Sequence, residues 1–235
     1  MTPLYVALDF NTEREMENFL APFHSHPIPV KIGMSQFYMS GPALIEKLSA
    51  KGFPIFLDLK CHDIPNTVYL ALKQLSQYPV DMVTVHCLGG QKMMEAAVAG
   101  ANEGPYRPKV MGITQLTSTS KAMLNEEMAI SGDVITSVIS LAQLAKKSGL
   151  DGVVSSVLET RAIKQATAPD FLNLTPGIRL EKAKNDDQTR IATPAEAREA
   201  GSDYLVVGRP ITQAKDPLKA YQAFVDSWNS QRKED

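Results

Sequence analysis

The segment FLDLKCHDIPNT, residues 56–67, places three charged side chains at the end of an apolar run. Asp58, Lys60 and Asp63 alternate in sign there. Strand packing requires none of them, because burying an unpaired charge is costly. An ammonium held between carboxylates can stabilise a developing negative charge and deliver a proton, so the segment predicts electrostatic and acid–base chemistry. A D-x-K pair alone would more simply be a strand-end charge or a structural salt bridge.

Two segments that combine glycine and arginine predict a phosphate site. TPGIR carries Pro176 and Arg179, and VVGRP carries Gly208 and Arg209. Glycine lets backbone N–H groups approach a ligand, and arginine forms charge-assisted bonds to phosphate oxygens. Ordinary turn chemistry is the simpler alternative for either segment alone. Between them runs the polar stretch RLEKAKNDDQTR, which we expect to be a mobile loop able to close over the phosphate, with Gln188 as a contact.

Eight short apolar runs indicate the strands that must position these side chains. Their near-continuous apolar character is typical of strands buried on both faces. The runs are residues 4–10, 29–34, 54–60, 82–87, 109–114, 152–157, 171–178 and 204–210.

Helical signals fill the intervals between the runs. Thr12 and Glu15 have the spacing of a capping box, and Thr193 and Glu196 repeat it late in the chain. Pro65 lies where a helix would begin, directly after the charged segment. Strands that alternate with helices form either a closed barrel or an open sheet.

The number of strands favours a single-domain (β/α)8 TIM barrel, an α/β fold, over residues 1–235. No first turn carries the G-x-G-x-x-G of an open dinucleotide-binding sheet, and no Walker A sequence occurs. Active sites of such barrels form where the carboxyl ends of the strands meet. We therefore expect Asp9 and Lys31, from the first two runs, to converge with Asp58 and Lys60 at one mouth.

Composition argues against several classes of function. A formal net charge of −2 gives no reason to expect nucleic acid or an anionic membrane as partner. No stretch approaches the roughly 18 apolar residues of a membrane span, and Asp9 comes too early for a secretory signal, so we expect a cytoplasmic protein. Cys61 and Cys87 are expected to be free thiols. The histidines of PFHSHPIP lack a carboxylate or cysteine cluster, so no metal site is expected.

Seven segments of the chain match a known family in order. They are ALDF, VKIGM, DLKCHDIPNTV, TQLTSTS, TPGIR, NDDQTR and VVGRP, spread over nearly the full length. Together they resemble the orotidine 5′-phosphate decarboxylase family, of bacterial type. The match is specific, because DLKCHDIPNT is longer than a generic D-x-K-x-x-D. One departure is Cys61, where relatives often carry an aliphatic residue; in an extended strand its side chain points away from Lys60.

The resemblance implies decarboxylation of orotidine 5′-monophosphate (OMP) to UMP, the last step of de novo pyrimidine biosynthesis, by a cofactor-free homodimer. Lys60 would protonate C6, Asp58 would lie against the substrate carboxylate, and Lys31 would join the charge network. Asp63 and Thr67 would reach the site from the partner subunit, Asp63 as a catalytic residue. The resemblance also implies the remaining contacts: Asp9 on the ribose, Thr117 and Pro176 on the pyrimidine, and Arg179, Gln188, Gly208 and Arg209 on the phosphate or its closing loop.

The residue types suit that reaction. Loss of CO2 from C6 leaves a carbanion that the pyrimidine ring cannot delocalise as an enolate. No cofactor motif supplies an electron sink, so fixed charges must stabilise the carbanion, and Lys60, which neighbouring carboxylates keep protonated, can then protonate it. Asp58 acts either by repelling the departing carboxylate or as one of the charges tuned to the transition state. Binding of the remote phosphate can raise the rate by driving loop closure.

Three alternative functions share part of the pattern. Sugar-phosphate decarboxylases and hexulose-phosphate synthases have D-x-K-x-x-D, but they use magnesium and usually carry glutamate where Lys31 stands. A Schiff-base aldolase needs a lysine in an apolar pocket, whereas Lys60 has acids around it. A catalytically silent nucleotide-binding protein would not need the charge set. Decarboxylation of OMP without added metal separates these alternatives.

Overall fold

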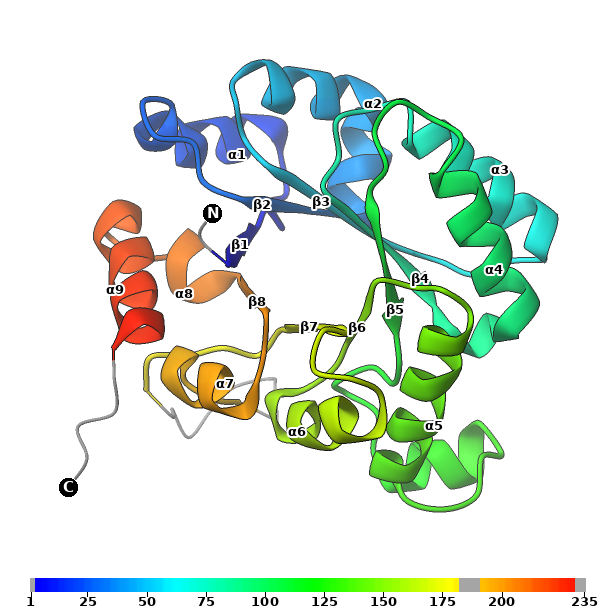
Figure 1. The fold of residues 1–235 in the computed structure, drawn as a ribbon. Coiled ribbons are helices and arrows are strands. Elements are labelled where there is room, and N and C mark those ends of the chain that lie inside the picture. Colours follow the sequence, from blue (N-terminus) through cyan, green and yellow to red (C-terminus); the bar gives the residue numbers. More distant parts are fainter. Residues whose placement is uncertain (1–2, 182–190, 231–235) are drawn as a thin grey trace.

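The computed structural model describes residues 3–181 and 191–230, which form a closed barrel of parallel strands with helices on its outside (Figure 1). Each strand pairs with the next one along the chain, and β8 closes the ring against β1. The strands are β1 Leu4–Ala7, β2 Val30–Gly33, β3 Ile55–Cys61, β4 Met82–His86, β5 Lys109–Ile113, β6 Gly152–Val154, β7 Leu172–Thr175 and β8 Tyr204–Val207. Each predicted run corresponds to one strand, although β3 extends one residue past its run to Cys61, so the predicted (β/α)8 barrel is confirmed.

Helices occupy the intervals between the strands and surround the ring (Figure 1). They are α1 Glu13–Leu20, α2 Met34–Ala50, α3 Pro65–Leu75, α4 Gly90–Ala101, α5 Val134–Lys147, α6 Val157–Ala166, α7 Pro194–Ala200, α8 Arg209–Thr212 and α9 Pro217–Asn229. Short turns of other helix types lie at Ala21–Phe23, Cys87–Gly89 and Met123–Glu127. Helix α2 is broken at Gly41, whose φ of 60° only glycine adopts readily, and Pro42 begins its second part.

The predicted helix starts are confirmed with one correction. The Thr193 hydroxyl accepts a bond from the Glu196 N–H at 3.2 Å, and the Glu196 carboxylate accepts one from the Thr193 N–H at 2.8 Å. At α1 the Thr12 hydroxyl accepts from the Glu15 N–H at 3.2 Å, but the Glu15 carboxylate accepts from the N–H of Asn11. The first box is therefore not reciprocal, because the returning carboxylate reaches one residue beyond the cap.

Two apolar cores hold the barrel. The larger lies between the strands and the helices, and it includes Met16, Phe23 and Leu72. The smaller lies inside the ring, where the Tyr5 and Phe56 rings meet edge to face with centroids 5.5 Å apart. Parallel strands covered on both faces need apolar side chains on both, which explains the unbroken apolar runs in the sequence.

Three aspartates repeat one hydrogen-bonding device where even-numbered strands begin. Asp81, Asp151 and Asp203 directly precede β4, β6 and β8. Each accepts, through Oδ2, a bond from a backbone N–H of the preceding strand, and each donates its own N–H to the carbonyl of that same residue. The partners are Ile55, Val110 and Asn173, with carboxylate bonds of 2.9, 2.8 and 2.7 Å and backbone bonds of 2.8, 3.0 and 2.8 Å.

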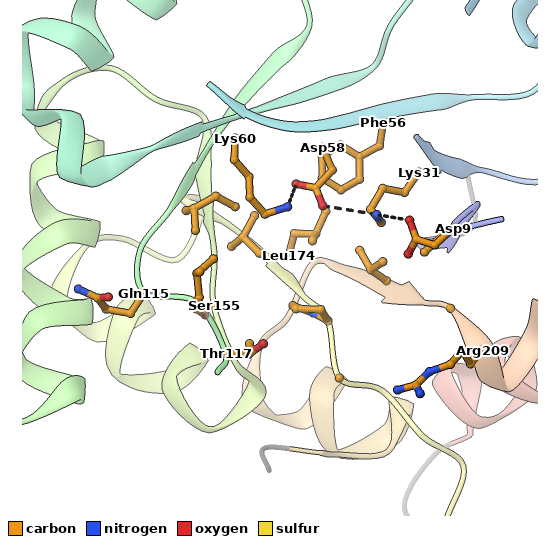
Figure 2. Close-up of a pocket in the computed structure, with 18 of the residues that line it drawn as sticks. Asp9, Lys31, Phe56, Asp58, Lys60, Gln115, Thr117, Ser155, Leu174 and Arg209 are labelled. Carbon is orange, nitrogen blue, oxygen red and sulfur yellow. Dashed lines mark hydrogen bonds and ion pairs between the residues drawn. The ribbon is translucent and has the colours of Figure 1, made fainter. Parts of the chain in front are cut away.

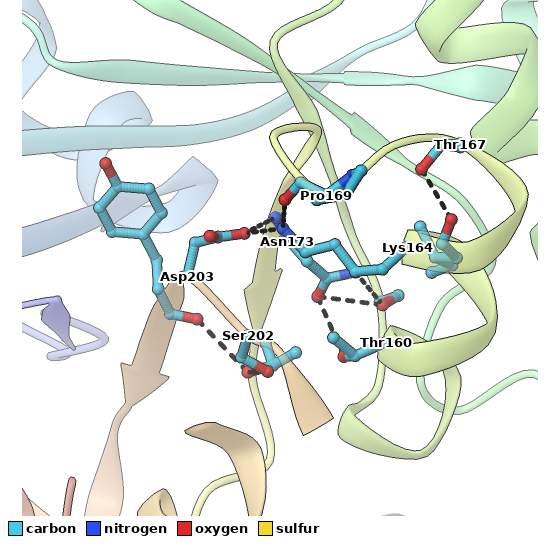
Figure 3. Close-up of polar contacts among 11 residues, drawn as sticks. Thr160, Lys164, Thr167, Pro169, Asn173, Ser202 and Asp203 are labelled. Atoms are coloured by element: carbon cyan, nitrogen blue, oxygen red, sulfur yellow. Dashed lines mark hydrogen bonds and ion pairs between the residues drawn. The ribbon is translucent and has the colours of Figure 1, made fainter. Parts of the chain in front are cut away.

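The third of these aspartates belongs to a wider polar network (Figure 3). Lys164 Nζ donates to Asp203 Oδ2 at 2.7 Å and to the carbonyl of Pro169 at 2.9 Å. Asn173, fully buried on β7, joins this network to the Thr160 hydroxyl on α6. The contacts tie β7 and β8 to α6 at the start of the two strands, which is the end of a barrel that serves stability.

Within residues 3–181 and 191–230, no helix is long and apolar enough to cross a membrane. Cys61 and Cys87 are both free, as predicted. Burial raises the pKa of both thiols, that of Cys87 to about 12.

Candidate active site

Four charged side chains form a row of alternating sign inside the mouth of the barrel (Figure 2). Lys31 Nζ lies 3.4 Å from Asp9 Oδ1 and 3.5 Å from Asp58 Oδ2. Asp58 Oδ1 in turn lies 2.8 Å from Lys60 Nζ. The convergence predicted from the strand ends is therefore present, with Asp58 held between two ammonium groups.

The first three strands set the spacing of this row. Lys31 lies on β2, and Asp58 on β3 pairs in register with Gly33. Gly33 leaves the room that the row occupies, because a Cβ there would lie 3.1 Å from Asp9 Oδ1 and 3.2 Å from Lys31 Nζ. Asp9 follows the end of β1 and lies at the rim, with more than half of its side chain exposed.

Burial and charge act on Asp58 in opposite directions. Burial alone raises the pKa of its carboxyl. The neighbouring ammonium groups of Lys31 and Lys60 outweigh burial, with help from the hydrogen bond that Thr84 donates, and the pKa lies below its ordinary value. Asp58 is consequently a carboxylate at neutral pH although only 14% of its side chain is exposed.

The row forms one wall of a pocket of about 370 Å³. The pocket floor is the inner core of the barrel, where Ala7, Phe56 and Leu174 belong both to that core and to the lining. Thr117 and Arg209 lie across the pocket from Asp58 (Figure 2). The pocket brings together nine of the predicted site residues: Asp9, Lys31, Asp58, Lys60, Thr117, Pro176, Arg179, Gly208 and Arg209.

The predicted phosphate segments lie at the ends of β7 and β8, on the rim of this pocket. Gly177 has a φ of 78°, a conformation that favours glycine, and it allows the chain to turn directly after β7. Ala192 closes the base of the segment between the two strands, because it donates to the carbonyl of Gly177 at 3.2 Å and accepts from the Arg179 N–H at 2.9 Å. Gln188, predicted as a contact from this loop, lies outside the described residues.

Two predicted site residues do not line the pocket. Asp63 and Thr67 are exposed where β3 passes into α3, and Asp63 Oδ1 accepts a bond from the Ile64 N–H at 2.7 Å. The side chain of Ile64 is also exposed. Asp63 and Thr67 therefore lie outside the pocket of their own chain, where they would be accessible to another molecule.

The structure adds residues that the sequence did not single out as site residues. Ser155 and Gln115 both line the pocket (Figure 2). The Ser155 hydroxyl accepts a bond from the side-chain amide of the buried Asn173 at 3.0 Å, and the Gln115 amide donates to the Ser137 hydroxyl of α5. Thr84 lies behind the charged row, in the middle of the apolar run MVTVHC. A polar residue inside an otherwise apolar run was the only available signal.

The histidines beside the site pack against each other. His62 and His86 stack with ring centroids 5.4 Å apart. Burial, together with the charges of His62 and Lys60, lowers the pKa of His86 to about 4, so His86 is neutral at physiological pH. Nδ1 of His86 accepts a bond from the Leu88 N–H. His86 is therefore a packed, hydrogen-bonded side chain beside the pocket.

No group of three or more histidine, cysteine, aspartate or glutamate side chains within residues 3–181 and 191–230 is arranged to hold a metal ion. Between Asp9 and Asp58, the two pocket carboxylates, lies the ammonium of Lys31. A metal bound there would have to compete with a cation that the protein itself supplies.

Comparison with known proteins supports the family resemblance. The model of the Orotidine 5′-phosphate decarboxylase / HUMPS family matches residues 2–224. The chain belongs to this family. Orotidine 5′-phosphate decarboxylases of Geobacillus kaustophilus and Bacillus licheniformis are 48% and 49% identical to it, over 99% and 97% of this chain and 97% of each relative.

Solved structures of the orotidine 5′-phosphate decarboxylase family have the same fold. The crystal structure of the orotidine 5′-phosphate decarboxylase from Lactobacillus acidophilus superimposes with a TM-score of 0.88 at 41% identity, over 98% of this chain and all of that one. The Pyrococcus horikoshii structure of that name, at 22% identity, has a TM-score of 0.76 over 97% of this chain and 100% of its own, and shows the common barrel.

Proposed function

We propose that this protein decarboxylates orotidine 5′-monophosphate to UMP, the last step of de novo pyrimidine biosynthesis. Membership of the family and identity near one half to decarboxylases over almost the whole chain support the activity. The observation that carries the proposal is the row Asp9–Lys31–Asp58–Lys60 on one wall of a pocket whose rim holds arginine and glycine. The same pocket can therefore hold a pyrimidine against the charged row and bind a phosphate at its rim.

In the proposed reaction the bond between C6 and the carboxylate breaks, CO2 leaves, and the electron pair stays on C6. The Lys60 ammonium stabilises that charge and transfers one proton to C6, which gives UMP and a neutral amine. The amine then takes a proton from water. Lys60 suits both tasks because it lines the pocket and its Nζ is held there by the salt bridge to Asp58.

Asp58 is proposed to lie against the substrate carboxylate. Its own charge persists at neutral pH because two ammonium groups flank it. Fixed charges of this kind need no reorganisation when the substrate charge moves, which is the usual source of electrostatic catalysis in enzymes. Lys31 holds Asp58 from the other side and completes the network.

The remaining pocket residues are proposed to bind the substrate. Asp9 at the rim would take the ribose hydroxyls, and Thr117 and Pro176 would border the pyrimidine. A third set, at the ends of β7 and β8 and in the segment between them, would hold the phosphate: Arg179, Gln188, Gly208 and Arg209. Arginine side chains and glycine N–H groups are the donors that phosphate oxygens favour.

We further propose a homodimer in which Asp63 and Thr67 complete the site of the partner subunit. Both are exposed on the side of the barrel where β3 ends, and neither lines the described pocket of its own chain. An arrangement of this kind would add a third acid to the charged row. A cytoplasmic location is part of the same proposal.

The deciding experiment is an assay of OMP decarboxylation in buffer with a strong chelator, with UMP identified as the product. Turnover that does not depend on magnesium is expected. A sugar-phosphate activity that requires magnesium, without turnover of OMP, would instead place the chain with the hexulose-phosphate branch of the family.

A further inference from the structure

Strand β3 departs from regular pairing at the point where it carries the acid and the proton donor. Leu57 pairs with Val83 of β4 and Cys61 with Val85, so four steps along β3 correspond to two along β4. Lys60 lies within this bulge with a φ of 51°, in the left-handed region that a lysine rarely occupies. Such a conformation persists only where surrounding contacts hold it.

Thr84, between the two paired residues of β4, makes contacts of the required kind. Its hydroxyl oxygen accepts a bond from the Lys60 N–H at 2.8 Å, which supplies an acceptor where the two strands are out of register. The same hydroxyl donates to Asp58 Oδ1 at 3.0 Å. Thr84 is fully buried, so neither bond competes with solvent.

The two bonds act on both members of the reactive pair. Asp58 Oδ1 receives the Thr84 hydroxyl together with Lys60 Nζ, and Oδ2 faces Lys31. The carboxylate is thus fixed at both oxygens. The backbone of Lys60 is fixed through its N–H, and this sets where the side chain leaves the strand. One hydroxyl therefore fixes the Asp58 carboxylate and the Lys60 backbone relative to each other.

We propose that Thr84 is a positioning residue for the Asp58–Lys60 pair, and that its hydroxyl, rather than its bulk, sustains the bulge that directs Lys60 into the pocket. The inference rests on the proposed decarboxylase function for its kinetic part, but its structural part is independent of that function. Thr84 itself does not line the pocket, so it acts through the two residues that it contacts.

Two pairs of variants isolate the hydroxyl. Wild type and Thr84→Val differ by the hydroxyl at equal size, and Thr84→Ser and Thr84→Ala differ by it after loss of the methyl group. We expect Thr84→Val and Thr84→Ala to lower kcat by about tenfold to a hundredfold, the range for loss of a hydrogen bond to a charged group. KM and UMP affinity should change little, and Thr84→Ser should recover most of kcat.

Thr160→Val is the matched control. Thr160 is also fully buried, and its hydroxyl donates to the Ser156 carbonyl and to Asn173 Oδ1, away from the charged row. This variant should lose stability but retain the wild-type kcat. Wild-type kcat in Thr84→Val and Thr84→Ala, or equal kcat in the Ser and Ala variants, would overturn the proposal. If Thr84→Val does not fold, the Ser and Ala pair still decides it.

A crystal structure of Thr84→Val or Thr84→Ala gives a readout that does not depend on turnover. Lys60 should leave the left-handed region and Asp58 should change its rotamer. An unchanged Lys60 φ and an unchanged salt bridge would refute the positioning role. Absence of OMP turnover in the wild type would refute the proposed function instead, and the structure would then decide the role of Thr84 alone.

Discussion

The four charged side chains of the pocket differ in exposure, and exposure sets how strongly each charge is felt. Lys31 and Asp58 have side chains 10% and 14% exposed, Lys60 is 29% exposed, and Asp9 at the rim is 58% exposed. Water screens the Asp9–Lys31 pair, as it does most surface ion pairs. The two pairs that involve Asp58 are better shielded from water, so the fixed field is strongest around Asp58.

The pKa of Asp58 provides a prediction at this scale. The charged groups that face it are Lys31 from β2 and Lys60 on β3, and Thr84 of β4 adds a hydrogen bond. With Lys31→Met one cation is removed while burial remains, so the pKa of Asp58 should rise. The acid limb of the kcat/KM profile should then move to higher pH. An acid limb at the wild-type position would mean that Lys31 does not set this pKa.

The lowered pKa of Asp58 also makes the stability of the fold depend on pH. The pKa of Asp58 is lower in the folded chain than in the unfolded one, where it is about 3.9. The carboxylate therefore contributes stability above the unfolded pKa, and that contribution is lost as pH falls through the lower, folded pKa.

A second prediction concerns Arg209 on the rim of the pocket. If Arg209 binds the phosphate, Arg209→Ala should raise KM for OMP by about tenfold to a hundredfold, as expected for a lost charge-assisted bond. Turnover of orotidine, which lacks the phosphate, should not change. The two substrates are compared by kcat/KM, and an equal loss for both would show that Arg209 acts elsewhere.

At the scale of elements, the aspartates before β4, β6 and β8 are expected to stabilise the barrel without affecting catalysis. Asp151→Ala would leave the buried Val110 N–H without its acceptor and would remove the Arg107 salt bridge. We expect a loss of about 1–3 kcal/mol, hence a Tm several degrees lower, with unchanged kcat and KM. Asp151→Asn keeps an acceptor oxygen and is the control. An altered kcat with an unaltered Tm would contradict this division between the two ends of the barrel.

The strands were predictable because their apolar character is continuous, and the charged row was predictable because parallel strands in a barrel end at one mouth. The bulge in β3 was not. The run PIFLDLK has the composition of a regular strand, and the left-handed Lys60 depends on a threonine contributed by the next strand. Local patterns carry no information about such a contact. The half-formed box at Thr12 is a smaller case, because Asn11 competes for the same carboxylate.

At the scale of the whole molecule, the charged row and the phosphate segments come from opposite ends of the chain and meet only because β8 closes on β1. Gly208 follows β8 and lies next to β1: a Cβ added to it would lie 3.6 Å from the Cβ of Ala7, an ordinary contact distance. Closure of the barrel is therefore what creates the pocket. We propose that residues 1–235 form this single domain as a unit.

The proposed dimer leads to a test by subunit mixing. Lys60→Ala and Asp63→Ala homodimers should both be nearly inactive if Asp63 serves the partner's site. In a heterodimer of the two, one site has lost both residues and the other has neither substitution. Equal mixing after dissociation should therefore restore about a quarter of wild-type activity, since half of the dimers are mixed and half of their sites are intact. No recovery would place Asp63 in its own subunit's site, and an active Asp63→Ala homodimer would place it outside catalysis.

The central claim is that fixed charges, with Lys60 as the cation at C6, perform the decarboxylation. The most direct measurement is the single-turnover rate constant for CO2 release from OMP by wild type and Lys60→Ala, at saturating enzyme with chelator present. The account predicts a loss of at least about a hundredfold in Lys60→Ala, with UMP affinity and Tm largely retained. A rate constant in Lys60→Ala close to that of the wild type would contradict it.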